Sequence, residues 1–370
     1  MRIGLNATCF NDRPSGANQR FLGIYGALIR RNPDIEFVVY EPSDQRITTW
    51  FGVATNVTAC ATPIPSVGRL ARVRAGMGYW HRQLRQDRLD VFEAFHLPLV
   101  RAPDCPTILT IHDLRPLRAD APVLTRMIAK PIMRHALSHA DRIIAVSDAV
   151  SDEITAFHPS AQVSTIYNGV DRTAFAVASA ASIANVRARY SLPQSYILAL
   201  GHLEARKNVP LLIDAVAVLR ARGTSHPLVI VGNDGGDRAT IRAHIVAHGL
   251  KDLVTLIEHA DDDAVRAIYA GCRLLAFPSR YEGFGIPIVE AMAAEKPMVL
   301  ADTAVFRELT LGQGVYFPID DAGGAADAIE RVWGVQREHD RQIAFGHDRL
   351  KDFTFDRLAD QVADLYASLV

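Results

Sequence analysis

Short apolar runs alternate with amphipathic segments along the whole sequence, and this alternation occurs in two successive sets. The strand candidates are rich in Val, Ile and Leu, and they are Ile3–Leu5, Phe37–Tyr40, Val91–Phe95, Thr107–Ile111, Ile143–Val146, Thr165–Tyr167, Tyr196–Leu200, Leu228–Val231, Val254–Ile257, Leu274–Phe277 and Met298–Leu300. The helix candidates between them include Arg20–Arg30, Val209–Arg220, Arg238–His248, Ala264–Ala270 and Ala325–Val332. Strands that alternate with helices form parallel sheets covered on both faces, so the predicted class is α/β with doubly wound parallel sheets.

The two sets indicate two domains. The first set ends near the turn Tyr167–Asp171, and the second begins at Tyr196 after a stretch of mostly small residues. We therefore predict an N-terminal domain over 1–172 and a C-terminal domain over 190–350. A last helix within 351–370 can pack on either domain, and we expect it to return to the N-terminal one. Two doubly wound domains of this kind are expected to face a deep cleft at the carboxyl ends of their strands.

Composition excludes several classes of protein. With 49% apolar residues in 370, the chain is expected to fold, and Lys plus Arg (40) balance Asp plus Glu (41), which argues against a dedicated nucleic-acid binder. The four cysteines are widely spaced and form no CxxC pair, which favours a reducing compartment. The sequence has no signal-peptide pattern and no apolar run of membrane-spanning length, so we expect a cytoplasmic protein. No GxGxxG follows the first strand, which disfavours a dinucleotide-dependent oxidoreductase.

The most informative stretch, Phe277–Met292, is predicted to form a strand, a glycine loop and a helix. Gly285 permits a close approach to a ligand, and the following helix start offers free N–H groups to an anion. Glu282 lies in the loop and Glu290 about one turn into the helix, so both can face the same ligand. Carboxylates repel a bare phosphate but accept hydrogen bonds from sugar hydroxyls, which favours a nucleotide sugar. The alternative is that Glu290 only complements the helix dipole while Glu282 is solvated.

Three further segments carry candidate site residues. Arg206 and Lys207 stand between a strand and a helix, where two cations can hold a diphosphate; the alternative is a pair of solvated surface charges. His112 follows an apolar strand and can point towards a ligand, although a structural histidine explains it equally well. Gly16, in the loop Pro14–Arg20, can let the backbone approach a phosphate, but most such loops are only turns.

Together these segments resemble a known family. The segment from Pro278 to Ala293 matches the pattern PS-x-x-EGFG-x-P-x-x-EAMA, which contains the E-x7-E pair. The motifs HDL (112–114), NGVD (168–171) and RKN (206–208) occur in the expected order. The sequence from about Gly4 to about Glu308 is thus similar to the retaining glycosyltransferases of family 4, also called group 1. The resemblance implies the GT-B fold, in which two Rossmann-like domains bind the acceptor (N-terminal) and the nucleotide-sugar donor (C-terminal).

The resemblance also implies roles for residues of the C-terminal domain. Arg206 and Lys207 match the cations that hold the donor diphosphate. Glu290 matches the carboxylate that binds the ribose, and Glu282 the one that contacts the donor sugar.

The remaining implied roles concern loops of both domains. Phe284 and Gly285 match the loop whose amides touch the donor. In the N-terminal domain, His112 matches the histidine that faces the transferred sugar, and Gly16 the glycine near the phosphates. Relatives often have Arg where this chain has His202, so one phosphate contact is expected to be weaker or replaced.

The implied reaction moves a hexose, by best guess mannose from GDP-mannose, onto a hydroxyl of a glycan or lipid-linked oligosaccharide in polysaccharide biosynthesis. UDP-glucose or another nucleotide sugar is an alternative donor. An epimerase or phosphorylase, or a non-catalytic nucleotide-sugar or glycan-binding protein, is an alternative on the same scaffold. No metal is expected to be required, because cations can stabilise the leaving phosphate. The run Asp261–Asp263 is interpreted as a helix cap rather than a metal site.

A basic stretch in the first domain bears on the acceptor. Arginines at 69, 72, 74, 82, 85 and 88 surround Tyr79 and Trp80. Such a stretch can rest on the anionic inner face of a membrane that carries a lipid-linked acceptor. An ordinary solvated helix face is the alternative.

Overall fold

The computed structural model describes residues 1–13, 15–176 and 179–370, and the chain divides into two compact units. The first unit is Met1–Gly169 with Phe355–Val370, and the second is Val170–Thr354. Pro14 of the first loop and residues 177–178 of the expected linker lie outside the described residues. The division falls at Gly169 instead of within 172–190, because α7 (Arg172–Ala176) and α8 (Ala180–Tyr190) pack on helices of the second unit.

The described part of the first unit holds a seven-stranded parallel sheet with the order β3-β2-β1-β4-β5-β6-β7. Its strands are β1 (Arg2–Asn6), β2 (Glu36–Glu41), β3 (Val57–Ala61), β4 (Val91–Ala94), β5 (Thr107–Ile111), β6 (Arg142–Ala145) and β7 (Val163–Thr165). The strand order reverses next to β1, which is the topological switch of a doubly wound sheet.

Helices of the first unit follow the strands in chain order. They are α1 (Gly16–Arg20), the π-turn η1 (Phe21–Tyr25), α2 (Gly26–Arg31), η2 (Ile47–Phe51), α3 (Arg69–Gly76), α4 (Tyr79–Asp87), η3 (Arg115–Leu117), α5 (Val123–His139) and α6 (Asp148–Phe157). α1, η1 and α2 form one continuous helix, so the predicted helix Arg20–Arg30 begins earlier, at Gly16, and contains the π-helical segment η1.

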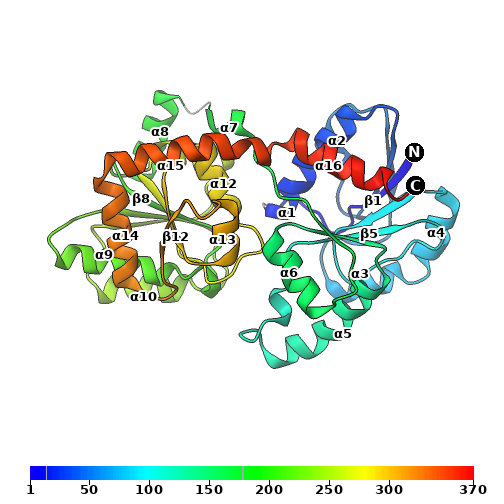
Figure 1. Cartoon of the computed structure of the whole chain (residues 1–370), viewed down its shortest axis with the longest axis horizontal. Coiled ribbons are helices and arrows are strands. Elements are labelled where there is room, and N and C mark those ends of the chain that lie inside the picture. The colour runs from blue at the N-terminus through cyan, green and yellow to red at the C-terminus, as the bar shows by residue number, and fades with distance from the viewer. Residues whose placement is uncertain (14, 177–178) are drawn as a thin grey trace. The chain divides into compact units, whose positions relative to one another are not determined.

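The chain returns to the first unit with its last helix, α16 (Phe355–Ala367), which lies beside α2 (Figure 1). Leu358, Val362 and Tyr366 recur at helical spacing and are fully buried. Such a stripe is the face that an amphipathic helix packs against a core.

The second unit holds a six-stranded parallel sheet among its described residues, with the order β10-β9-β8-β11-β12-β13. Its strands are β8 (Ile197–Leu200), β9 (Leu228–Val231), β10 (Val254–Ile257), β11 (Leu274–Phe277), β12 (Met298–Ala301) and β13 (Val315–Phe317). Besides α7 and α8, its helices are η4 (Ala205–Lys207), α9 (Val209–Ala221), α10 (Arg238–Ala247), α11 (Asp262–Gly271), α12 (Ile286–Ala293), α13 (Ala304–Leu309), α14 (Ala322–Gly334), α15 (Gln336–Arg349) and η5 (Leu350–Phe353). The switch in strand order lies between β8 and β11, so the segments after these two strands are brought together.

Candidate functional site

The segments after β8 and β11 meet in a cluster of charges. Lys207 Nζ lies 2.6 Å from Glu282 Oε1, and Arg206 Nη1 lies 3.0 Å from Glu282 Oε2. On its other side, Arg206 Nε donates to Glu204 Oε2 at 2.7 Å. The side chains of Lys207 and Glu282 are each only 11% exposed. The structure therefore brings three of the predicted site residues into direct contact and adds Glu204, which the sequence analysis did not single out.

The backbone around Lys207 fixes where its ammonium lies. Gly201, directly after β8, has φ +137°, and a Cβ there would come within 3.2 Å of Lys207 Nζ. Lys207 Nζ also lies 5.1 Å from the ring centroid of Phe277, the last residue of β11, in a cation–π contact. Asn208 then takes the left-handed conformation with φ +53° and donates its side chain to Asp320 at 2.9 Å. These constraints end η4 and start α9 with the lysine held next to the glutamate.

The electrostatics of the cluster favour the charged forms of Glu282 and Arg206. Burial alone raises the pKa of Glu282, but the charges of Lys207 and Arg206 outweigh burial and hold that pKa below its usual range. Burial also lowers the pKa of Arg206, whereas Glu282 and Glu204 outweigh it and raise that pKa. Two cations and two carboxylates thus balance, and the cluster carries no net charge of its own.

The glycine loop leads from this cluster into α12. Gly285 is the N-cap of α12 with φ +112°, a conformation that residues with a Cβ rarely adopt. The Phe284 side chain is buried, 4% exposed, and packs edge-on against Phe353. Glu290, one turn into α12, accepts a hydrogen bond at 3.0 Å from the Tyr269 hydroxyl on α11. Phe284 therefore anchors the loop through its ring, which leaves only its backbone to contact a ligand.

The other two predicted site residues, His112 and Gly16, belong to the first unit. His112 directly follows β5 and is partly buried. Burial, together with the charge of Arg20, lowers its pKa to about 3, so the imidazole is neutral at physiological pH. Gly16 is the first residue of α1, after the N-cap Ser15, whose Oγ accepts from Asn18 N at 3.1 Å.

Arg20 links α1 to the NGVD motif. Its buried guanidinium donates through Nη1 to the carbonyls of Ile166 and Tyr167, at 2.9 and 2.5 Å, and to Asn168 Oδ1 at 3.1 Å. These hydrogen bonds give Asn168, the first residue of the motif, a structural role.

The acidic run Asp261–Asp263 is a helix cap. Asp261 Oδ1 accepts from Ala264 N at 2.8 Å, and α11 begins at Asp262. The capping interpretation is confirmed, because this carboxylate satisfies a free N–H group of the first turn.

Two sequence families match the chain. The family described as glycosyl transferases group 1 matches residues 186–346, and the one described as Glycosyltransferase Family 4 matches residues 14–174. Together the matches span most of the chain, which therefore belongs to the family 4, or group 1, glycosyltransferases. The predicted GT-B fold class of two Rossmann-like parallel-sheet domains is confirmed.

Particular relatives are similar at modest identity. The chain is 26% identical over 226 residues to the O-antigen chain mannosyltransferase RfbU of Salmonella typhimurium, covering 60% of each chain. It is 31% identical over 237 residues to the alpha-D-kanosaminyltransferase of Streptomyces kanamyceticus, covering 61% of each. The match thus spans about three fifths of the length of these two relatives. A crystal structure of Anabaena HepE in complex with UDP and glucose superimposes with a TM-score of 0.76 at 20% identity, covering 100% of this chain and 99% of that one.

Within the described part of the chain, no helix is both long and apolar enough to cross a bilayer.

Proposed function

We propose that this chain is a retaining glycosyltransferase that moves a hexose, best matched by mannose from GDP-mannose, onto a hydroxyl of a glycan or lipid-linked oligosaccharide. The observation that carries the proposal is the contact of Lys207 and Arg206 with Glu282, at the carboxyl ends of β8 and β11. A simple anion site has no use for a buried carboxylate between its two cations. A nucleotide sugar has both a diphosphate for the cations and sugar hydroxyls for the carboxylate.

In the proposed reaction, each residue of the cluster has a separate role. The bond between the anomeric carbon and the diphosphate oxygen breaks, the acceptor oxygen bonds to that carbon, and the acceptor proton passes to the leaving phosphate. Arg206, Lys207 and the N–H groups at the start of α12 stabilise the charge that develops on this phosphate. Glu282 accepts hydrogen bonds from the sugar, Glu290 holds the ribose, and the loop amides at Phe284 and Gly285 touch the donor. This set supplies the charge stabilisation without assigning a metal to the reaction.

For two residues of the first unit, the family resemblance implies roles in transfer. His112 is neutral, so it can exchange hydrogen bonds with the transferred sugar without adding a positive charge beside the developing oxocarbenium. Gly16 lets the start of α1 approach the phosphates. The mannose assignment rests on the family motifs and on the relative named as a mannosyltransferase. Because another relative is named as a kanosaminyltransferase, other sugar donors are included in the experiment below.

A donor screen tests this proposal. The full chain is mixed with GDP-mannose, UDP-glucose, UDP-N-acetylglucosamine or the free diphosphates, and the unfolding midpoint and slow donor hydrolysis are measured. GDP-mannose is expected to raise the midpoint most, because binding to the folded state alone stabilises it by mass action. If only UDP-glucose raises the midpoint, UDP-glucose replaces GDP-mannose as the proposed donor. If no nucleotide sugar changes the midpoint or is hydrolysed, the proposed glycosyltransferase function is wrong.

The first unit offers a place for an anionic acceptor. A pocket of about 180 Å³ beside α3 and α4 has mostly apolar walls, including Trp80, and is also lined by Arg72 and His96. No described residue provides a hydrogen-bond partner for Nε or Nη2 of Arg72, although both atoms are buried. A phosphate attached to a lipid would meet both the guanidinium and the apolar walls.

Helix α3 also supports contact with a membrane. Leu70, Val73 and Met77 recur at helical spacing and are 87%, 42% and 75% exposed. Arg74 lies on the same helix, while the side chain of Arg69 is outside the described part of the chain. An exposed apolar stripe next to arginines fits the interface of an anionic bilayer.

Vesicle sedimentation tests the membrane contact. The chain is expected to bind vesicles rich in phosphatidylglycerol at low salt and to be released at high salt. The double change Leu70→Ser with Met77→Ser should abolish this binding, whereas Val246→Ser, an exposed apolar residue of the second unit, should not. Equal binding of all three proteins, or none by the wild type, would contradict the contact.

A further inference from the structure

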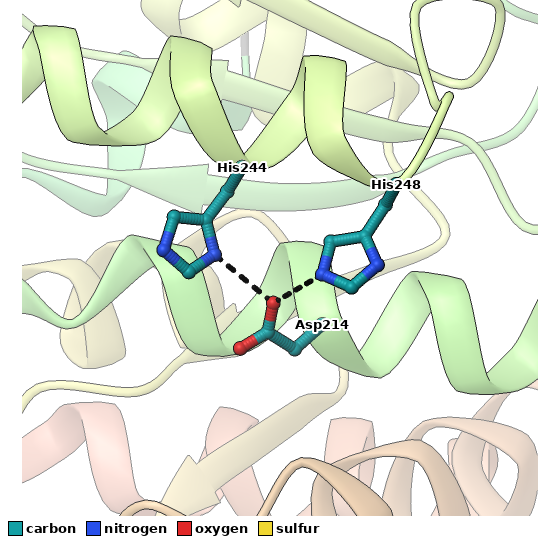
Figure 2. A group of neighbouring side chains, drawn as sticks. All are labelled: Asp214, His244 and His248. Atoms are coloured by element: carbon teal, nitrogen blue, oxygen red, sulfur yellow. Dashed lines mark hydrogen bonds and ion pairs between the residues drawn. The ribbon is translucent and has the colours of Figure 1, made fainter.

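A separate group of three side chains joins α9 to α10. Figure 2 shows Asp214 between His244 and His248, with both rings directed at one of its carboxylate oxygens. His244 Nδ1 lies 3.1 Å and His248 Nε2 2.9 Å from Asp214 Oδ1. One nitrogen or oxygen of each side chain lies within 4.8 Å of the others. None of these residues belongs to the proposed donor cluster.

The sequence places the two histidines on one face of α10. They are four residues apart, so they lie one above the other on a helix. Ile241 and Ile245 form the buried face of α10, and each histidine follows one of them by three residues, at the border of that face. α10 ends at Ala247 with His248 as its C-cap, and beyond it Gly249 has φ +63° and Leu250 N donates to Ile245 O at 2.9 Å. Both imidazoles are thereby held against α9, which carries Asp214.

We propose that Asp214, His244 and His248 form a binding site for a divalent transition-metal ion, best matched by Zn²⁺. Two imidazoles and a carboxylate are a common three-ligand set for zinc, with water in the fourth position. Ligands about 2 Å from a tetrahedral ion lie roughly 3.3 Å apart. The two distances to Asp214 need to lengthen by only a few tenths of an ångström. The two histidine nitrogens, which lie within 4.8 Å of each other, need to approach by at most about 1.5 Å, and partly exposed side chains allow both movements.

The surrounding charges suit a cation. The histidines lie at the carboxyl end of α10, where the helix dipole favours positive charge. The nearby Arg220 already donates to Gly249 O at 2.9 Å and to Asp252 at 3.2 Å, so its own charge is compensated. A histidine nitrogen and a carboxylate bind the ion only in their unprotonated forms, so Zn²⁺ binding at this site is expected to weaken as the pH falls. A bound ion would fasten α9 to α10 and stabilise the second unit.

Metal titration tests the site. The full chain, prepared without a histidine tag, is titrated with Zn²⁺ by calorimetry and with Co²⁺ by visible spectroscopy, each without nucleotide. We expect one ion per chain, a cobalt spectrum of low coordination number and a Zn²⁺-dependent rise in the unfolding midpoint. His248→Ala and Asp214→Asn should each weaken Zn²⁺ binding at least about tenfold, since even outer partners of metal sites contribute that much.

A matched control separates this site from ordinary surface histidines. His135 and His139 have the same four-residue spacing on α5, with ring centroids 4.0 Å apart, but they do not belong to a three-ligand group in the described residues. The double change His135→Ala with His139→Ala should leave affinity and stoichiometry unchanged. The proposal is overturned if the wild type binds no Zn²⁺, or if His248→Ala, shown by circular dichroism to be folded, binds it as tightly as the wild type.

Discussion

Replacing Lys207 by methionine is expected to lower kcat/KM for sugar transfer by roughly 10²–10³-fold, the loss that follows removal of one preorganised charge-stabilising group. Methionine keeps the length of the lysine stem against Gly201 and Phe277 but removes the charge that pairs with Glu282. Because this charge acts most strongly on the departing phosphate, kcat should fall more than KM for the donor rises. The measurement is steady-state transfer with the donor that the screen selects.

The control for this variant is another partly buried lysine of the same unit. Lys296 donates through Nζ to Ala270 O at 2.8 Å, at the end of α11. Lys296→Met removes a charge of the same kind outside the cluster, so transfer should stay close to the wild type. If Lys207→Met unfolds with the wild-type midpoint and retains kcat/KM within about threefold, the charge stabilisation assigned to Lys207 is wrong. A transfer rate reduced equally in both variants would point to a general effect of lost charge.

The fold could be predicted from the sequence to the extent that strands are buried. Central strands such as β5 (Thr107–Ile111) and β11 (Leu274–Phe277) are fully buried and mostly apolar, and they were predicted with their observed bounds. The sequence analysis missed β3 (Val57–Ala61) and β13 (Val315–Phe317), each at one edge of its sheet, but it predicted β10 at the opposite edge of the second sheet with its observed bounds. β3 is mostly exposed and therefore lacks the apolar run on which the prediction relies. Such a strand is specified by pairing with its neighbour, which a local pattern does not contain.

The candidate site shows a similar limit. Motifs placed Arg206, Lys207 and Glu282 in one site, but not Glu282 between the two cations. Asp320 was missed because it meets Asn208 across more than a hundred residues of chain. Glu204 could have been predicted, since a carboxylate two residues before an arginine is a candidate ion-pair partner for it. The spacing of His244 and His248 also offered a metal-site signal, but Asp214 joins them only when α9 packs on α10.

A buried carboxylate in the first unit escaped the sequence analysis altogether. Glu93, on β4, is fully buried and accepts hydrogen bonds from Tyr25 at 2.5 Å, from Thr110 at 2.6 Å and from Tyr366 at 2.5 Å. Burial raises the pKa of Glu93, which the three hydroxyls and the charge of Arg20 oppose. Since Tyr366 lies on α16, this group connects the end of the chain to the centre of the first sheet.

Glu93→Leu is therefore expected to destabilise the first unit by about 3–5 kcal/mol, because each buried hydroxyl left without its acceptor costs roughly 1–3 kcal/mol. The substitution leaves three buried hydroxyls without their acceptor and the Arg20 charge less compensated. Tyr366→Phe removes a single hydrogen bond and should cost only about 1 kcal/mol. Urea unfolding measures both. In a Trp333→Phe background, the fluorescence of Trp50 and Trp80 reports the first unit alone.

The combined change Glu93→Leu, Tyr25→Phe and Tyr366→Phe decides whether the loss comes from unpaired hydroxyls. Removing both tyrosine hydroxyls with their acceptor leaves only Thr110 unpaired, so the triple variant should be more stable than Glu93→Leu alone. A triple variant destabilised by the sum of the single changes would show that these groups act independently. In that case the Tyr366 hydroxyl would contribute to stability independently of Glu93, and its hydrogen bond to Glu93 would not be what holds α16 to the sheet.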